Sequence, residues 1–408
     1  MAPTPKPRLG RDRPLRRSCL TNSACGTCLL SAYSHVIWWR SFRDAEPCKT
    51  SLLLQHSPLE HISHIAIHVC HLRAILITNQ MQTATPLQVP MDKSRVDSVV
   101  NNGDFKVDDN VLVKFPKGTT VISAHRFGVS SWTVTARLHI LLPDGTEESY
   151  FLKSASEAHG RTLIEGEFNA MSELYKWAPY LVPKPHSWGR YRDDEPEVYF
   201  FLSQYIDMSD RMPDPDQLCE NLARLHREST STTGQYGLHV TTCQGRATQS
   251  VAWEKDWTVF FIKLLQHVID VDFELNGAWD ELDRAEKRLI QLVIPRLLGA
   301  LTTEGRKIKP SLIHGDLWEG NIGTAVDGGD VYLFDSAAFY AHSELEVADW
   351  RPYYNKISNK VYLETYLKYQ EPSEPKEEWD DRNRLYSIYW NVIYSVNHVA
   401  QGKAIRQV

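Results

Sequence analysis

Residues 311–335 constrain the fold of this chain more than any other part of its sequence. A short apolar run leads into His314-Gly315-Asp316, Asn321 follows five residues after Asp316, and Asp335 ends a second apolar run. An aspartate, then an asparagine, then a second aspartate after a hairpin is the side-chain pattern of a phosphoryl-transfer site. The pattern predicts that Asp316 is the catalytic residue, which accepts the proton of an acceptor hydroxyl. Asn321 and Asp335 are then the metal ligands, and the expected cofactors are ATP and Mg²⁺.

The hairpin inside this segment supports the predicted metal site. A turn rich in Asp and Gly at residues 324–330 separates two short apolar strands. The turn returns Asp335 close to Asn321, as shared ligation of one ion requires. Mg²⁺ takes hard oxygen ligands and uses only one or two carboxylates, while phosphates and water complete its shell. His314 is placed to orient the loop by hydrogen bonding.

A strand-rich region upstream supplies a candidate phosphate-binding lysine. We expect strands over residues 111–115, 121–130, 132–142 and 149–153, with turns at 116–118 and 143–146. The last strand ends in Lys153, where a kinase-like N-terminal lobe carries the lysine that contacts the ATP phosphates. The loop 127–131 would lie over these phosphates, with Gly128 as its only glycine.

The helix predicted over residues 158–177 identifies a partner for Lys153. Apolar residues recur there at helical spacing, at Ile164, Phe168, Met171 and Tyr175. Glu167 falls inside this apolar arc, whereas Glu165 lies well away from its centre. A carboxylate on a buried face is costly unless it is paired. We therefore expect Glu167, rather than Glu165, to pair with Lys153 in the ATP-binding site.

The remaining elements suggest a two-lobed molecule. A buried strand at 198–202 leads into residues 203–207, a hinge at which Gln204 and Tyr205 would contact adenine. Helices are expected over 215–228, from Trp257 onward and over 279–301. The polar loop 229–255 between them is long enough to be functional or to act as a lid.

These elements predict an α+β, protein-kinase-like fold with a small antiparallel β N-terminal lobe, one helix in that lobe and a mostly α C-terminal lobe. The expected domain limits are 91–202 for the N-terminal lobe, 203–207 for the hinge and 208–408 for the C-terminal lobe.

Composition excludes some classes of partner. The formal net charge of −6 disfavours a nucleic-acid-binding protein, which usually presents a basic face. No run approaches the roughly 20 apolar residues that span a bilayer. We therefore expect no nucleic-acid or membrane partner, a cytoplasmic location, and a monomer or weak dimer.

Residues 1–90 differ from the rest of the chain and allow three interpretations. They carry ten Lys and Arg against four Asp and Glu, and five of the seven cysteines. The segment is an atypical extension, disordered or wrongly included upstream of Met81 or Met91, or residues 1–40 are a mitochondrial transit peptide. Cys25 and Cys28 with later histidines form a third, weaker candidate, a zinc site without finger spacing. The cysteine-poor body favours a reducing compartment.

Two departures from protein kinases indicate a small-molecule acceptor. Gly315 stands where protein kinases carry an arginine that reads an activation-loop phosphate. Asp335-Ser336-Ala337 replaces Asp-Phe-Gly, and no Ala-Pro-Glu segment follows. This pattern resembles the small-molecule kinases of the aminoglycoside phosphotransferase type.

A closer resemblance covers about residues 95–408. The sequence His314-Gly315-Asp316-Leu317-Trp318-x-Gly320-Asn321 and the residues of 334–346 (FDSAAFYAHSELE) are similar to the fructosamine/ketosamine-3-kinase family. Phe151-Leu152-Lys153, Glu165-Gly166-Glu167, Leu222-Ala223-x-Leu225-His226 and Trp257-x-x-Phe260-Phe261 are similar as well. The stretch 379–408 is similar to fungal members. Members of the family continue with another helix after the position of Val408, so the resemblance implies a missing C-terminal segment.

The resemblance implies an enzyme, a phosphotransferase with an alcohol group as acceptor. Its substrates would be ketosamines, free or on glycated proteins, such as ribulosamine and fructosamine. Phosphorylation of their 3-hydroxyl gives an unstable product, so the amine is freed and the protein is deglycated. Trp318, Tyr340 and His342 would border the sugar. A kinase of the aminoglycoside or choline type and a catalytically inactive nucleotide-binding protein remain as alternatives.

Overall fold

The computed structural model describes residues 103–130, 133–192, 195–209 and 211–399. All of them belong to the unit Tyr33–Val408. The interpretations of residues 1–90, including the transit peptide and the zinc site at Cys25 and Cys28, concern residues outside these ranges. The same holds for Ser131 of the expected phosphate loop.

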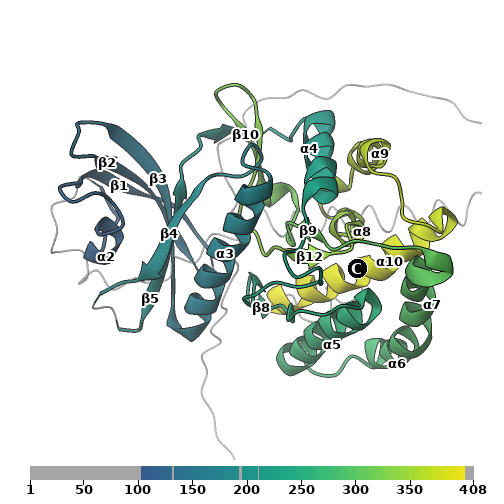
Figure 1. The fold of residues 1–408 in the computed structure, drawn as a ribbon. Coiled ribbons are helices and arrows are strands. Elements are labelled where there is room, and N and C mark those ends of the chain that lie inside the picture. Colours follow the sequence, from purple (N-terminus) through teal and green to yellow (C-terminus); the bar gives the residue numbers. More distant parts are fainter. Residues whose placement is uncertain (1–102, 131–132, 193–194, 210, 400–408) are drawn as a thin grey trace, which may run out of the picture. The chain divides into compact units, whose positions relative to one another are not determined.

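The N-terminal lobe is built on a five-stranded antiparallel sheet with strand order β1-β2-β3-β5-β4 (Figure 1). Its strands are β1 (Thr120–Val129), β2 (Val134–Leu141), β3 (Glu147–Ser156), β4 (Pro185–Arg190) and β5 (Val198–Gln204). Alternating residues of β2, such as Ala136 and Leu138, are buried on one face. The register pairs Thr135 with Lys153, so that Lys153 lies on the other face. The predicted strands from residue 121 onward are thereby confirmed within a few residues.

The first predicted strand is wrong. Residues 111–115 do not form a strand, and the short helix α2 (Asp109–Leu112) begins there instead. The side chain of Asp108 caps this helix by accepting a hydrogen bond from the backbone N–H of Asn110. Val111 is fully buried whereas Val113 is 67% exposed, so the apolar run has only one buried side. The cap, three residues before the start of this run, outweighed its β-branched composition.

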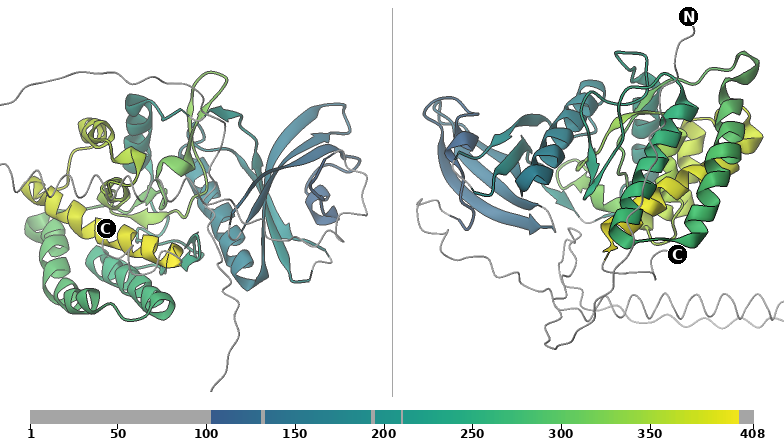
Figure 2. Two further views of the ribbon diagram at one scale, coloured as in Figure 1. Left: turned by 180° about the vertical axis from the view of Figure 1, so that it is seen from behind. Right: turned by 90° about the horizontal axis from the view of Figure 1, so that it is seen from below.

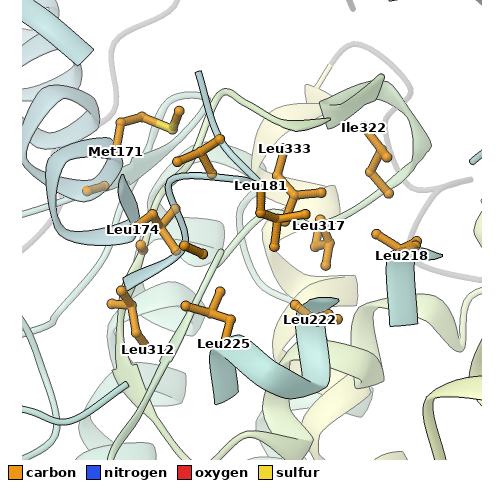
Figure 3. Packing of buried hydrophobic residues seen from close by; sticks show 14 of the residues in the cluster. Met171, Leu174, Leu181, Leu218, Leu222, Leu225, Leu312, Leu317, Ile322 and Leu333 are labelled. Carbon is orange, nitrogen blue, oxygen red and sulfur yellow. The ribbon is translucent and has the colours of Figure 1, made fainter. Parts of the chain in front are cut away.

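Helix α3 (Glu157–Trp177) links the two lobes. It lies between the sheet and the second lobe in Figures 1 and 2, and it contacts β3, β4 and β5. Its buried residues Met171 and Leu174 share one hydrophobic cluster with residues of the second lobe. Figure 3 shows these side chains beside Leu181, Leu225 and Leu312. A single core therefore joins the helix that carries Glu167 to the elements that carry the predicted catalytic residues.

The C-terminal lobe is mostly helical. Its longer helices are α4 (Pro215–Glu228), α5 (Trp257–Asn276), α9 (Lys360–Tyr369) and α10 (Trp379–Asn397). Helix α4 has the predicted bounds, because Asp214 caps it and Pro215 occupies its first turn. The predicted helix 279–301 is divided into α6 (Asp280–Arg288), a π-helical turn (Leu289–Val293) and α7 (Ile294–Gly299). Pro295 lacks a backbone N–H, which accounts for the break just before it.

Short strands frame the predicted phosphoryl-transfer segment. β9 (Ser311–Ile313) pairs with β12 (Phe339–Ala341), and β10 (Ile322–Ala325) pairs with β11 (Val331–Leu333). β10 also pairs with β6 (Met208–Ser209), directly after the hinge. A separate hairpin of β7 (Cys243–Gln244) and β8 (Ala247–Thr248) lies in the long polar loop. Within the described ranges, no helix is long and apolar enough to cross a membrane.

Candidate active site

Lys153, Glu167 and Asp335 form one ion-pair cluster although three different elements carry them. The Nζ atom of Lys153 is 2.7 Å from Oε2 of Glu167 and 2.5 Å from Oδ1 of Asp335. The Lys153 and Glu167 side chains are only 6% and 4% exposed, whereas that of Asp335 is 46% exposed. The predicted contact of Lys153 with Glu167, rather than with Glu165, is confirmed. Glu165 instead forms a more exposed pair with Arg161.

The opposite charges in this cluster shift the pKa values of their partners toward the ionised forms. Burial by itself lowers the pKa of the Lys153 ammonium, but Asp335 and Glu167 reverse this effect and raise it. Burial also raises the pKa of Glu167, while the Lys153 ammonium opposes that shift. Breaking such a buried pair leaves an uncompensated charge, which is strongly destabilising. The cluster therefore holds the Lys153 ammonium in a fixed position on the face of β3 opposite Leu152.

Two amide groups clamp the carboxylate of Asp316. Nε2 of Gln244 donates to Oδ1 at 2.5 Å, and Nδ2 of Asn321 donates to Oδ2 at 2.8 Å. Burial and the nearby Asp335 raise the pKa of Asp316 to about 7, while the two amide hydrogen bonds lower it. A carboxylate whose pKa is raised toward neutral pH is a better proton acceptor than an ordinary surface aspartate.

The backbone of the loop around Asp316 is held by the side chain of Glu346. Glu346 accepts hydrogen bonds from the backbone N–H groups of His314 and Gly315. The predicted orienting role of His314 has a geometric basis, because its Nε2 lies 3.0 Å from the carbonyl oxygen of Phe334. Gly315 has φ +79°, and a Cβ there would lie 2.4 Å from the carbonyl oxygen of Ala337. Only glycine fits this turn without a shift of the backbone.

Asn321 and Asp335 have the donor chemistry of a magnesium site. They offer an amide oxygen and a carboxylate, both hard oxygen ligands. Nδ2 of Asn321 also lies 3.5 Å from the backbone oxygen of Asp335, which brings the two residues together as predicted. Asp335 adopts φ 57°, a left-handed conformation that costs a non-glycine residue on the order of 1–3 kcal/mol. The described residues contain no cluster of three or more metal-ligating side chains. The pair therefore fits an ion that phosphates and water also coordinate.

Of the residues predicted at the hinge and the phosphate loop, Tyr205 and Phe127 are in contact, whereas Gln204 pairs with Tyr150 and lies on the opposite face of the sheet from Lys153. The ring of Tyr205 contacts Phe127 edge-on at 5.7 Å, and Arg137 lies 4.4 Å above it. Gly128 lies in β1, where its carbonyl oxygen accepts a hydrogen bond from Oγ1 of Thr135. The backbone N–H of Gln204 donates to the carbonyl oxygen of Lys184, so this N–H is already used within the protein.

The expected sugar-binding residues divide into two groups. Trp318 is half-buried two residues after Asp316, and its ring lies over Gly320, where a Cβ would approach it to 2.2 Å. Tyr340 and His342, by contrast, are only 1% and 2% exposed. We correct the prediction for these two residues, because each has its polar atoms bonded inside the protein.

The internal partners of Tyr340 and His342 indicate positioning roles. The Tyr340 hydroxyl accepts from Nε1 of Trp177 at 3.0 Å and donates to Glu173 at 2.7 Å. It thereby joins the end of α3 to β12. The two ring nitrogens of His342 lie 2.9 Å from the hydroxyls of Tyr386 and Ser373. These bonds connect the segment after β12 to α10, and burial lowers the pKa of His342 to about 4.

Gln244 is the residue that the sequence analysis missed. The loop 229–255 was predicted to be functional, but nothing in its polar sequence distinguishes Gln244 from its neighbours. Its proximity to Asp316 joins residues 72 positions apart. A pattern of local spacing carries no signal for such a contact.

Comparison with known proteins identifies relatives of this chain. The sequence model of the fructosamine kinase family matches residues 121–404. The ketosamine-3-kinase of Mus musculus is 28% identical over 275 residues, which cover 62% of this chain and 83% of the mouse protein. The chloroplastic protein-ribulosamine 3-kinase of Oryza sativa subsp. indica is 29% identical over 246 residues. That match covers 59% of this chain and 65% of the rice protein, slightly less than two thirds of its length.

A solved structure supports the fold. A protein from Thermobifida fusca assigned as a fructosamine-3-kinase superposes with a TM-score of 0.52 at 19% identity. The superposition covers 71% of this chain and 91% of the other. At this identity the likeness extends to the two-lobed architecture alone.

Proposed function

This chain belongs to the fructosamine kinase family, and from that premise we propose that it transfers the γ-phosphoryl group of ATP to the 3-hydroxyl of ketosamines. The relatives named for ketosamine and protein-ribulosamine phosphorylation support this acceptor class. The substrates would include ketosamines on glycated proteins.

The single observation that carries the proposal is the convergence of five polar side chains from distant parts of the sequence. Lys153, Glu167 and Asp335 form the ion-pair cluster, and Asn321 connects that cluster to Asp316. These are the groups that kinase-like phosphoryl transfer needs for positioning and charge neutralisation.

Asp316 is the group that would receive the proton. The oxygen of the acceptor 3-hydroxyl attacks the γ-phosphorus, the bond from that phosphorus to the bridging oxygen of ADP breaks, and the hydroxyl proton passes to Asp316. Because each carboxylate oxygen has two lone pairs, the amide bonds from Gln244 and Asn321 leave room for the acceptor hydroxyl.

The ion-pair cluster would bind the phosphate end of the nucleotide. Lys153 is fixed by Glu167 and could contact phosphate oxygens, while Asp335 and Asn321 would hold the metal ion. Mg²⁺, when bound, neutralises the charge of the phosphates and helps to align them. Lys153 takes only Oδ1 of the half-exposed Asp335 carboxylate, so that side chain can still act as a ligand.

We also propose that the reaction leads to protein deglycation. A ketosamine phosphorylated at the 3-hydroxyl carries a good leaving group beside the carbonyl carbon. Loss of a proton from C1 gives an enaminol, which breaks the C3–O bond and expels inorganic phosphate. Water then hydrolyses the resulting C1–nitrogen imine, which frees the lysine amine and leaves a 3-deoxy-dicarbonyl sugar.

Product analysis with defined acceptors tests the proposal. Purified full-length protein is incubated with MgATP and ribulosyl-lysine, fructosyl-lysine, choline, homoserine or an aminoglycoside, and ADP release is measured with mass analysis of the acceptor. We expect phosphate addition to the ketosamines and little to the others. Turnover of choline or an aminoglycoside without ketosamine turnover would refute the assignment.

A further inference from the structure

A loop segment crosses from the helix that carries Glu167 to the catalytic carboxylate. Residues 236–249, here called the strap, contain the β7–β8 hairpin and lie within the long polar loop. We propose that Gln244 is a positioning residue that orients Asp316, and that the strap couples this orientation to the seating of α3. The inference rests on the proposed role of Asp316 in phosphoryl transfer.

Gln244 meets Asp316 in a restricted geometry. Its Nε2 donates to Oδ1 at 2.5 Å, while Asn321 holds Oδ2, so rotation of the carboxylate about its last bond is blocked from both sides. The Oε1 atom of Gln244 is buried and has no hydrogen-bond partner in the structure. The amide is therefore engaged by its nitrogen alone, and its contact with Asp316 fixes its orientation.

The strap is attached to α3 at three points. Nε2 of His159, near the start of the helix, lies 3.2 Å from the carbonyl oxygen of Gly245. Oδ1 of Asn169 lies 3.1 Å from Nε2 of His239. Between them, Gly166 approaches so closely that a Cβ there would lie 2.6 Å from the carbonyl oxygen of Thr241.

These three positions occupy one face of α3. His159, Gly166 and Asn169 are separated by seven and three residues, which places them on a common side of a helix. Glu167 directly follows the glycine of this face and points to Lys153. A shift of α3 that displaces Glu167 must therefore also move the strap.

The other side of the strap is attached to α10. Nδ2 of Asn397 donates to the carbonyl oxygen of Gln244 at 3.0 Å, and its Oδ1 accepts from the backbone N–H of Arg246 at 3.0 Å. Nε2 of the buried Gln249 donates to the Tyr389 hydroxyl at 3.1 Å. The backbone of Gln244 is thereby fixed against both lobes, and its side chain transmits that position to Asp316.

Two substitutions of similar shape separate positioning from simple packing. Gln244→Met keeps the length of the side chain but removes the donor, and we expect kcat to fall about 10–100-fold. Gln244→Glu keeps the shape but places a second carboxylate beside that of Asp316. The two groups repel each other, so kcat should fall further. The KM for ATP should stay unchanged in both. Gln235→Met, the same exchange just before the strap, should have native kcat.

The kcat values of these variants, compared with that of the native protein, test the inference. If Gln244→Glu is as active as the native protein, or if Gln244→Met has native kcat, Gln244 does not orient Asp316. If the native protein fails to phosphorylate ketosamines, the proposed function is wrong, but the role of Gln244 can still be tested. The same variants are then compared in hydrolysis of ATP with water as acceptor.

A thermal double-mutant cycle tests the contact without any activity. At pH 8, Gln244→Glu should lower Tm by about 2–4 °C through like-charge repulsion. Adding Asp316→Asn should restore most of that loss, because the second charge is gone. Additive shifts in Tm would show that the two side chains do not interact, and would overturn the inference even for an inactive protein.

Discussion

Asp316 and Asp335 lie before and after the β10–β11 hairpin and carry the same side chain, yet the protein surrounds them differently. Two neutral amides hold Asp316, from Gln244 and Asn321, whereas the Lys153 ammonium holds Asp335. Burial raises the pKa of Asp316 to about 7. Asp335, with nearly half of its side chain exposed, faces the space where a nucleotide would lie.

The difference fits the two tasks proposed for these aspartates. An amide orients a carboxylate without neutralising it, so Asp316 retains the basicity that a proton acceptor needs. Asp335 instead pairs with a buried cation, which suits the role of metal ligand proposed for it. The contrast follows from the neighbours of each carboxylate and can be broken by changing either set.

The largest expected effect is the loss of the proton acceptor. Asp316→Asn keeps the shape but removes the base, and we expect kcat to fall about 10²–10⁴-fold. MgATP binding should persist, because the ion-pair cluster is intact. Steady-state kinetics and equilibrium titration with MgATP measure the two effects. Unchanged phosphorylation would exclude Asp316 as the acceptor.

The complementary change replaces Asp335, the half-exposed carboxylate partner of Lys153. Asp335→Asn should lower kcat about 10²–10³-fold, since charge stabilisation at the phosphates is lost. Unlike Asp316→Asn, it should also raise the Mg²⁺ concentration needed for half-maximal activity. Mg²⁺ titrations of both variants check the distinction. Identical titration curves would contradict the proposal that Asp335 binds the metal ion and Asp316 accepts the proton.

A smaller effect is expected for Glu167, which contacts Lys153 and is one contact further from the proposed phosphate site. Glu167→Gln weakens the hold on Lys153 but leaves Asp335 in place, so we expect a rise of about tenfold in the KM for ATP, the scale for an outer partner. Glu165→Gln, on the same helix two residues earlier, loses only a partly exposed pair with Arg161 and should have native kinetics. Equal behaviour of the two variants would contradict the assignment of Glu167.

The smallest effect concerns the backbone that presents Asp316. Gly315→Ala and Gly329→Ala both place a side chain at positive φ, +79° and +75° respectively. Nothing lies near Gly329, so its variant should lose only about 1 kcal/mol of unfolding free energy. Gly315→Ala should lose more, because its Cβ meets the backbone oxygen of Ala337. Denaturant unfolding of both variants provides the comparison, and equal losses would remove the argument for a tight turn.

Most local elements could be predicted from the sequence. Alternating residues predicted β2 and β3, and apolar residues at helical spacing predicted α4 with the bounds that it has in the structure. The position of Glu167 in an apolar arc predicted its contact with Lys153, because a buried carboxylate requires a cation. The strand expected at 111–115 failed, since a short apolar run is ambiguous until its burial is known.

The candidate sugar site could be predicted only in part. Trp318 remains half-buried beside the catalytic loop, but Tyr340 and His342 point into the protein and bond to α3 and α10. Their place near Asp335 in the sequence indicated proximity along the chain. It did not indicate the direction of each side chain, which depends on the elements packed around β12.

The sequence by itself determined the order of the chemical groups, from Lys153 and Glu167 to Asp316, Asn321 and Asp335. It could do so because motif spacing and hydrophobic periodicity are local signals that extend over only a few residues. Tertiary structure alone decided that Gln244 clamps Asp316 and that Asp316 and Asp335 differ in environment. Those properties arise from segments far apart in the chain that pack together, and desolvation and hydrogen bonding depend on the completed packing.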